Sequence, residues 1–331
     1  MARSKLSDVN FQSSVFKDTF NGEFYDKLAL LNSLMVRSPE DYIPSNTKGY
    51  TDTLPKWNEM SGDLKQIVTG LSTTYNLLAD YVDIAVWVER EVAFQAEDIL
   101  LTVAGQDKDV TKEVARQAGE FFAKKVHGLG ASVLTGIFTT TLASTHVKDD
   151  SGVVINNNGL IDAKNKLGDN GDDLIDLCVH SKVAGDMLKE EIATYTPNSA
   201  NDAYQSGRLN AKVGMRVSQS DLFTPSGSVY NSYLGRPGSL IYQFRDKPIA
   251  SFSNANIINL GNIFLELVRD AETAGGIDGM IFRFSGAFHA PGVQWNGTVA
   301  SNPTDAQLQT GANWTKVAPT KGIKLVQYKS K

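Results

Sequence analysis

The side chains that most often perform chemistry are few and scattered in this chain. The four histidines are His127, His146, His180 and His289, and no two share a helical face or a close spacing. A zinc site needs three or four converging ligands, usually with local pairs in the sequence. Cys178 lies in the apolar run Leu-Cys-Val, where we expect a buried core residue rather than an exposed nucleophile. We therefore predict no metal site, no catalytic residue and no cofactor.

Two acidic clusters and one glycine-rich stretch also fail the tests for chemistry. Asp149-Asp150 and residues 169–173 do not match the D-x-[DN]-x-[DN]-G calcium loop, so solvated turns are the simpler interpretation. GLGASVLTG (128–136) matches neither nucleotide-phosphate pattern, and no G-x-S-x-G nucleophile motif occurs. Carboxylate pairs for glycoside hydrolysis can be far apart in sequence and stay open as an alternative.

Four tryptophans could form a stacking platform for sugars or bases. Trp57, Trp87, Trp295 and Trp314 lie in different segments, which favours core and interface packing. A carbohydrate-binding or hydrolytic module is the alternative that these residues leave open.

Composition excludes several classes of protein. A chain of 331 residues can form one large domain or two ordinary ones. Its net charge of -5 argues against nucleic-acid binding that depends on basic residues, although weak contact stays possible. The N-terminal MARSKLSDVNF lacks the apolar core of a signal peptide, and no run approaches the ~18 apolar residues of a membrane helix. We expect no membrane association.

A helix predicted over 108–140 is the clearest element that could position other parts of the chain. It would be roughly 50 Å long at 1.5 Å per residue, with Asp109 as a plausible N-cap. Gly119, Gly128, Gly130 and Gly136 suggest a bend or close approach by another backbone. The apolar stripe comprises Val110, Val114, Ala118, Phe121, Leu129, Val133 and Ile137, extended by Phe122 and Val126.

The remaining pattern is that of a mixed α and β protein with appendages. Residues 15–36 have loose helical spacing, and residues 45–90 read as an extended two-stranded hairpin. We also expect a helix at 160–167, a buried strand at 173–181 with Ser181 capping the next helix, and strands at 212–219, 239–244, 262–295 and 322–329. Arms and hairpins that leave a compact body commonly bury themselves on neighbouring subunits, so this pattern indicates an assembling protein.

Several motifs in one order carry a family resemblance. RDAETAGGIDGMIFRFSGAFHAPGVQW (269–295) is followed by NPTDAQLQTGANWTKV (302–317), and DLIDLCVHSKVAGDMLKEE (173–191) lies upstream. In these motifs the chain resembles the major capsid proteins of tailed bacteriophages, which have the Hong Kong ninety-seven-type fold. It departs from them in carrying one arginine, Arg283, in the strand 280–288, and in the more polar loop 192–211.

The resemblance implies an α+β architecture with five regions. These would be an N-arm (1–40), an E-loop hairpin (41–82), a P-domain (83–145) with its spine helix at about 108–140, an A-domain (146–255), and a β segment returning to the P-domain with the C-terminal segment (256–331). The stretch HAPGVQWNG (289–297) would end a framework strand, turn the chain and anchor it by packing.

The resemblance also implies a function. The chain would form pentamers and hexamers of an icosahedral virion head around double-stranded DNA, assembled in the host bacterial cytoplasm. A separate scaffolding protein is expected because only about 40 residues precede the hairpin, together with a portal and a decoration or cement protein. No lysine–asparagine cross-link is expected from Lys48, Lys56 or Lys65. An encapsulin-like nanocompartment shell is the alternative within the same fold.

Two groups of residues are predicted to matter for assembly. Candidate contacts between subunits are Tyr50, Leu54, Lys56, Trp57, Phe16, Phe20 and Phe24. Candidate framework-packing residues are Phe121, Leu129, Pro291, Trp295 and Trp314.

Overall fold

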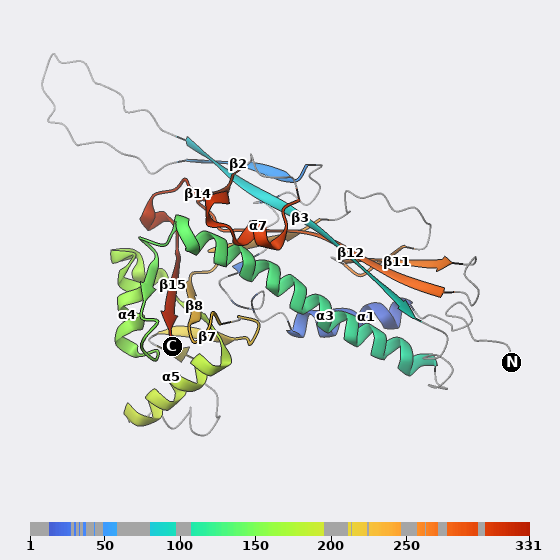
Figure 1. Ribbon diagram of the computed structural model, residues 1–331, viewed down its shortest axis with the longest axis horizontal. Helices are drawn as coiled ribbons and strands as arrows, with labels where there is room; N and C mark the ends of the chain where they lie inside the picture. The colour runs from blue at the N-terminus through green and yellow to red at the C-terminus, as the bar shows by residue number, and fades with distance from the viewer. Residues whose placement is uncertain are drawn as a thin grey trace, which may run out of the picture.

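Two β-sheets and one long helix organise the chain in the computed structural model (Figure 1). None of the described helices is long and apolar enough to cross a membrane. The structure describes residues 13–27, 30, 33, 36–37, 43, 49–57, 80–96, 107–194, 211–212, 214–223, 225–245, 257–261, 263–270, 277–296 and 302–331.

The larger sheet has seven strands and is built around β12 (Ile277–His289). β12 pairs antiparallel with β11 (Ile263–Asp270) on one side and with β3 (Asp80–Ala96) on the other. β3 has 17 residues, about three times the usual strand length. The other strands are β1 (Val36–Arg37), β2 (Thr51–Trp57), β9 (Leu240–Phe244) and β10 (Ile257–Asn259).

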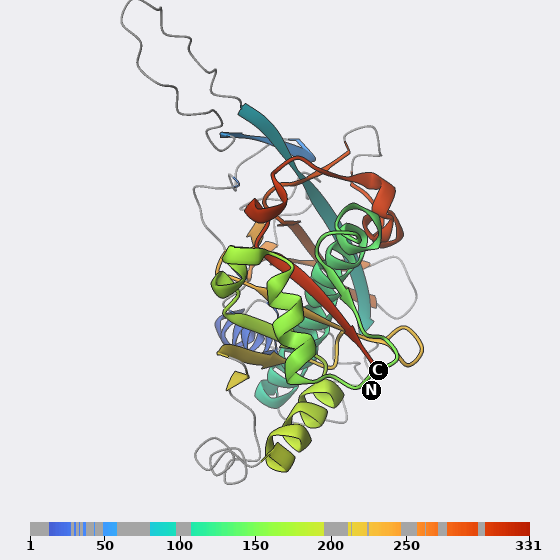
Figure 2. The ribbon, with the colours of Figure 1, turned by 90° about the vertical axis from the view of Figure 1, so that its left-hand side faces the viewer.

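The smaller sheet has six strands and its own core beneath two helices, α4 (Asn157–Asn165) and α5 (Ser181–Thr194). Figure 2 shows these helices beside the C-terminal strand. In sheet order the strands are β4 (Val147–Asp149), β15 (Leu325–Ser330), β8 (Tyr230–Gly235), β5 (Asp176–Val179), β7 (Met215–Gln219) and β6 (Ala211–Lys212).

The sheets do not follow the predicted boundary between 146–255 and 256–331. β9 belongs to the larger sheet, where it pairs with β12, and β15 belongs to the smaller sheet, where it pairs with β8 and β4. Neither pairing was predicted from the sequence, for one reason. An alternating pattern identifies a strand and its buried face, whereas its partner is decided by contacts distant in sequence.

The long helix α3 covers Asp107–Gly136 and continues as a π-helical turn over Ile137–Thr141. The helix predicted over 108–140 is confirmed, but it begins two residues before the proposed cap Asp109. Its buried face contains Phe122, whereas Phe121 is only partly buried. Of the two adjacent phenylalanines in the predicted stripe, Phe122 is therefore at its centre and Phe121 at its edge.

Three of the four helix glycines mark close approaches. A Cβ atom at Gly119 would lie 2.8 Å from the carbonyl oxygen of Phe20, and one at Gly130 would lie 2.8 Å from a methyl carbon of Leu30. At Gly136 it would overlap the carbonyl oxygen of Leu308. These contacts explain why glycine stands in a helix interior that otherwise disfavours it.

Helix α1 (Ser13–Lys27) packs along α3 and contributes to the main core. Phe16, Phe20 and Phe24 are at most 1% exposed, and the Phe20 ring lies 6.2 Å from Phe122 and 6.4 Å from Phe282. Their predicted role as contacts between subunits is therefore wrong, because the subunit's own core already buries these side chains.

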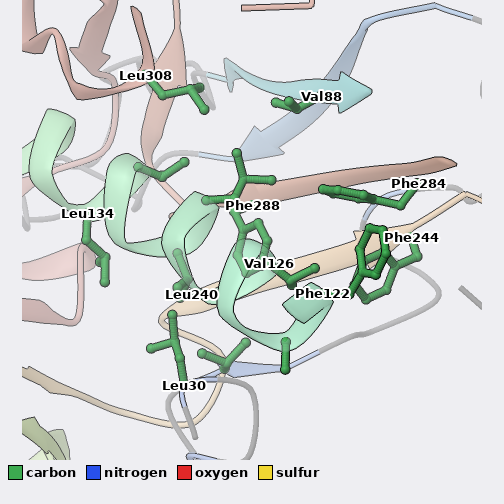
Figure 3. Close-up of a cluster of buried hydrophobic side chains, with 14 of the residues drawn as sticks. Leu30, Val88, Phe122, Val126, Leu134, Leu240, Phe244, Phe284, Phe288 and Leu308 are labelled. Atoms are coloured by element: carbon green, nitrogen blue, oxygen red, sulfur yellow. The ribbon is translucent and has the colours of Figure 1, made fainter. Parts of the chain in front are cut away.

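The main core lies between α3 and the larger sheet. Figure 3 shows Phe122 and Val126 of α3 facing Phe284 and Phe288 of β12, with Phe244 of β9 alongside. Burial on this scale is the dominant stabilising term of such a fold. The core thus holds β12 and β3 in the orientation from which the hairpin departs.

Helix α5 is capped by a different residue from the one predicted. The imidazole Nδ1 of His180 accepts a hydrogen bond from the backbone nitrogen of Lys182 at 3.1 Å, and the His180 carbonyl accepts from Ala184 at 3.0 Å. Ser181 is instead the first residue of the helix. An imidazole is an uncommon N-cap acceptor, so residue preferences favoured the neighbouring serine.

Candidate assembly surface

The hairpin of β2 and β3 has one buried face and one exposed face. Alternation along β2 places Asp52 and Leu54 against the body of the protein, paired with Ala85 and Asp83 of β3. The opposite face of β2 is solvent-exposed at Thr51, Thr53, Pro55 and Trp57. Figure 1 shows β2 lying along the upper half of β3, on the other side of the molecule from α5.

The exposed face carries an apolar patch that we call the outer hairpin face, formed by Pro55, Trp57 and Val82. Trp57 is 74% exposed and Val82 is 44% exposed. Pro55 pairs directly with Val82, and Trp57 pairs with Asp80 at the end of the strand. A tryptophan with this degree of solvent exposure offers a large apolar area to a partner.

The base of the hairpin is joined to the turn after β12 by a buried carboxylate. Asp83 Oδ2 accepts a hydrogen bond from the backbone nitrogen of Gly292 at 2.8 Å, and His289 Nε2 lies 2.9 Å from the same oxygen. The Asp83 and His289 side chains are both 0% exposed. Gly292 has φ +90°, a conformation that glycine adopts without strain. The stretch HAPGVQWNG thus ends a strand and contacts the base of the hairpin through Asp83.

A second set of contacts holds the hairpin base where β2 begins. The indole Nε1 of Trp87 donates to Asp52 Oδ2 at 2.5 Å, and the Arg245 guanidinium lies 4.5 Å from the Trp87 ring centroid. Arg245 also donates to the carbonyl of Gly49. A guanidinium over an indole face is a favourable cation–π arrangement, strengthened here by burial.

Tyr50 and Lys56, which were predicted as subunit contacts, are both partly buried at the base of the hairpin. Tyr50 Oη donates to Glu89 at 3.3 Å, and burial, then the Glu89 carboxylate, raises the pKa of Tyr50. Lys56 is partly buried, and burial lowers its pKa while the Asp83 charge opposes that shift. Leu54 is only 7% exposed and faces inward, so its predicted role between subunits is wrong.

The segment after β12 is held by two tryptophans that pack edge to face. β13 (Val293–Trp295) pairs with β14 (Trp314–Lys316), which sets the Trp295 and Trp314 rings edge to face at 5.0 Å. The indole Nε1 of Trp314 donates to the carbonyl of Leu308 at 2.8 Å, beside α7 (Asp305–Gln309). Trp295, Trp314 and Leu129 are buried, and Pro291 is partly buried, which suits the packing role expected of them.

Arg90 fastens this segment to β3 where the hairpin joins the body. Its guanidinium donates to the carbonyl of Pro303 at 2.7 Å and to Asp305 at 2.8 Å. Asn302 Oδ1 accepts from the Glu89 backbone nitrogen at 2.9 Å. Arg90 was not among the residues predicted from the sequence, although a charged residue beside a buried apolar strand indicates a specific partner.

Asp83 and Arg245 were also not predicted, because their partners lie far away in the sequence. Asp83 interrupts the apolar run Tyr-Val-Asp-Ile-Ala-Val, where a carboxylate requires a partner. Sequence alone does not identify that partner, because it comes from 206 to 209 residues further along the chain.

The residues considered for chemistry are not brought together. Within the described part of the chain, no three His, Cys, Asp or Glu side chains could hold a metal ion. Cys178 is buried, and burial raises the pKa of its thiol to about 12. Two cavities, of about 320 and 510 Å³, lie beside α3 and share Phe121, Lys125 and Asp305 in their walls.

Comparison with known proteins identifies the fold. No family model matches the chain. The major capsid protein of Bacillus phage SPP1 is 24% identical over 346 residues, covering 99% of this chain and 98% of that protein. The solved capsid of Ralstonia phage GP4 superposes with a TM-score of 0.57 at 7% identity, with 90% of each chain covered. The chain has the fold of tailed-phage capsid proteins.

Two further structures share this capsid fold. The capsid of cyanophage P-SCSP1u has a TM-score of 0.55 at 9% identity, covering 90% of this chain and 86% of that one. A chain of Mycobacterium phage Che8 has a TM-score of 0.54 at 12% identity, with 89% of each chain covered. The α+β, Hong Kong ninety-seven-type capsid fold expected from the sequence is confirmed.

Proposed function

We propose that this chain is the structural major capsid protein of a tailed phage, and that it assembles as pentamers and hexamers into the icosahedral head around double-stranded DNA. The observation that carries the proposal is similarity over nearly the whole length of both chains to a phage major capsid protein. The capsid fold found in solved phage structures supports it. The role is structural rather than enzymatic, and the mature protein belongs to the virion.

The outer hairpin face supplies a physical basis for assembly. Trp57 and Val82 are exposed on a hairpin whose base is hydrogen-bonded to the body of the protein. Burying a tryptophan and a valine on a neighbouring subunit would contribute a few kcal/mol per contact. Many such contacts act together in a closed shell, so each can be weak while the shell is stable.

The regional assignments form part of the proposal. The hairpin of β2 and β3 acts as the E-loop, α3 as the spine helix of the P-domain, and the six-stranded sheet with α4 and α5 as the A-domain. Of the proposed N-arm, residues 1–40, the structure describes helix α1 and residues 30, 33 and 36–37, and the other positions lie outside the described residues.

The proposed partners follow from the same assignment. Assembly takes place in the host bacterial cytoplasm with a separate scaffolding protein and a portal, and the finished shell receives a decoration or cement protein. Contact with packaged DNA is weak, because the chain carries a net charge of -5.

The two alternatives lack a supporting observation. An encapsulin-like shell shares the fold, but the curated relative is a phage capsid protein. A carbohydrate-binding module would need tryptophans at a surface, whereas Trp87, Trp295 and Trp314 are at most 4% exposed.

Electron microscopy of the purified protein tests the proposal. We expect closed shells, tubes or ring-shaped capsomers, formed either by the protein alone or with a phage scaffolding protein, and light scattering should report the matching mass. A uniform 36.0 kDa monomer under both conditions would contradict the capsid function.

A further inference from the structure

The hairpin and the body share one continuous strand, so something must set the angle between them. β3 pairs with β2 from Asp80 to Val86 and with β12 from Trp87 to Ala96. An isolated two-stranded hairpin twists and bends readily. Its direction is therefore determined where side chains of its base reach the body.

Asp83 makes that contact from within the hairpin half of β3. It lies four residues beyond Trp87, the last residue of β3 that pairs with β12. Its Oδ2 atom accepts a hydrogen bond from the Gly292 backbone nitrogen at 2.8 Å and lies 2.9 Å from His289 Nε2. The contact thus spans from the hairpin to the turn between β12 and β13.

The receiving side of this contact is rigid. A Cβ atom at Gly292 would lie 2.6 Å from Ala318 and 3.1 Å from Ile323, so this turn is tightly packed as well as held at φ +90°. His289 closes the site as the last residue of β12. Tight packing at Gly292 therefore fixes the position of the N–H group that Asp83 accepts from.

The chemistry of the contact argues for orientation rather than for stability alone. A buried carboxylate loses its hydration, and an apolar residue at the same place is often as stabilising. Asp83 Oδ1 also has no hydrogen-bond partner among the described residues. The other titratable groups near Asp83 on the hairpin are Lys56 of β2 and Tyr81 of β3. What the hydrogen bond from the Gly292 nitrogen supplies is direction, because hydrogen bonds are geometrically specific.

We infer that Asp83, held by Gly292 and His289, is the positioning residue that fixes the angle of the hairpin and thereby places Trp57 for contact with a neighbouring subunit. The inference rests on the proposed capsid function. Trp57 lies three residues beyond Leu54, the cross-strand partner of Asp83, which is about 10 Å along the strand. A tilt of about 10° at the base would move Trp57 by about 2 Å, enough to spoil close packing.

Distance measurement between two spin labels tests the angle directly. Labels at Thr53→Cys on the hairpin and Lys189→Cys on α5 are suitable, because both positions are exposed while Cys178 is buried and does not react. We expect one narrow distance distribution in the unassembled subunit. Asp83→Asn, which keeps the shape and removes the charge, should broaden it at least twofold.

Shell yield and a matched control complete the experiment. Asp83→Asn should lower the yield of shells at least tenfold, whereas Asp80→Asn, at the exposed end of the same strand, should change neither the distance distribution nor the yield. The inference is overturned if Asp83→Asn keeps both a narrow distance distribution and a normal yield of shells. It is also overturned if Asp80→Asn broadens the distribution and lowers the yield as much as Asp83→Asn does.

A second pair of variants decides the matter if Asp83→Asn does not fold. His289→Gln keeps a polar side chain beside Asp83 and should retain the narrow distribution, whereas His289→Leu should broaden it. If both stay narrow, or if both also unfold, Asp83 contributes stability only and the inference is wrong. The labelled subunit needs no assembly, so a wild-type protein that forms no shells counts against the proposed function and leaves the angle measurement standing.

Discussion

Gly119 of α3 lies directly against the backbone of Phe20 in α1, so close that a Cβ atom there would be 2.8 Å from the Phe20 carbonyl oxygen. A backbone atom cannot move aside as a flexible side chain can. We therefore expect Gly119→Ala to separate α1 from α3 and to lower the free energy of unfolding by about 1–3 kcal/mol. Urea unfolding of the isolated subunit measures the change.

Gly128 supplies the matched control on the same helix. A Cβ atom there would meet nothing within 4 Å among the described residues. Gly128→Ala should therefore raise the free energy of unfolding by about 0.5–1 kcal/mol, since alanine is the better helix former. Equal effects at the two positions would show that close approach is not what selects glycine at 119.

Trp57 should matter for assembly and not for the fold. At 74% exposure, Trp57→Ser should change the free energy of unfolding by less than about 0.5 kcal/mol. Removing its apolar surface should nevertheless reduce the yield of shells seen by electron microscopy. Ile161→Ser, at a 44% exposed position on α4, is a control for loss of surface hydrophobicity. Normal shell yield from Trp57→Ser would contradict the assigned contact.

Two adjacent phenylalanines of α3 should differ sharply when truncated. Phe122 is 2% exposed and contacts Phe20, Phe282 and Phe284, so Phe122→Ala should cost about 3–5 kcal/mol. Phe121 is only partly buried at the wall of a surface cavity, and Phe121→Ala should cost less than half as much. Thermal unfolding of both variants under one condition tests the register. Equal costs would mean that the buried stripe is centred between the two residues.

His127 should make the subunit sensitive to acid. Burial lowers the pKa of its imidazole to about 4, and its ring packs against Phe223 at 4.8 Å. The folded chain therefore resists a proton that the unfolded chain takes up near pH 6.5. The contribution is complete above that pH and is lost as the pH falls toward 4, by up to about 3 kcal/mol.

Replacing the imidazole isolates this effect. His127→Phe should flatten the fall in the free energy of unfolding between pH 6.5 and 4, measured in urea at several pH values. Some slope should persist, because burial also lowers the pKa of His146. An unchanged pH profile in His127→Phe would show that other groups cause the acid sensitivity.

Local patterns were sufficient for the elements of this protein. The apolar stripe of 108–140 predicted α3 because an α-helix repeats every 3.6 residues. β-branched and aromatic residues predicted the hairpin that contains β2 and β3, and alternation over 280–288 predicted part of β12. The order of motifs from 173 to 317 indicated the capsid fold. The glycines of α3 pointed to close approach before Phe20, Leu30 and Leu308 could be named as the neighbours.

Only the tertiary structure decided which residues meet. Asp83 and His289 are separated by 206 positions, and nothing in either segment specifies the other. The phenylalanines of α1 were predicted as contacts between subunits, but they pack beside α3 in the core of the same chain. Likewise β9 pairs with β12 and β15 pairs with β8, and each partner lies far away in the sequence. Periodicity is a local property of the chain, whereas strand pairing and buried polar contacts depend on which distant surfaces close together upon folding.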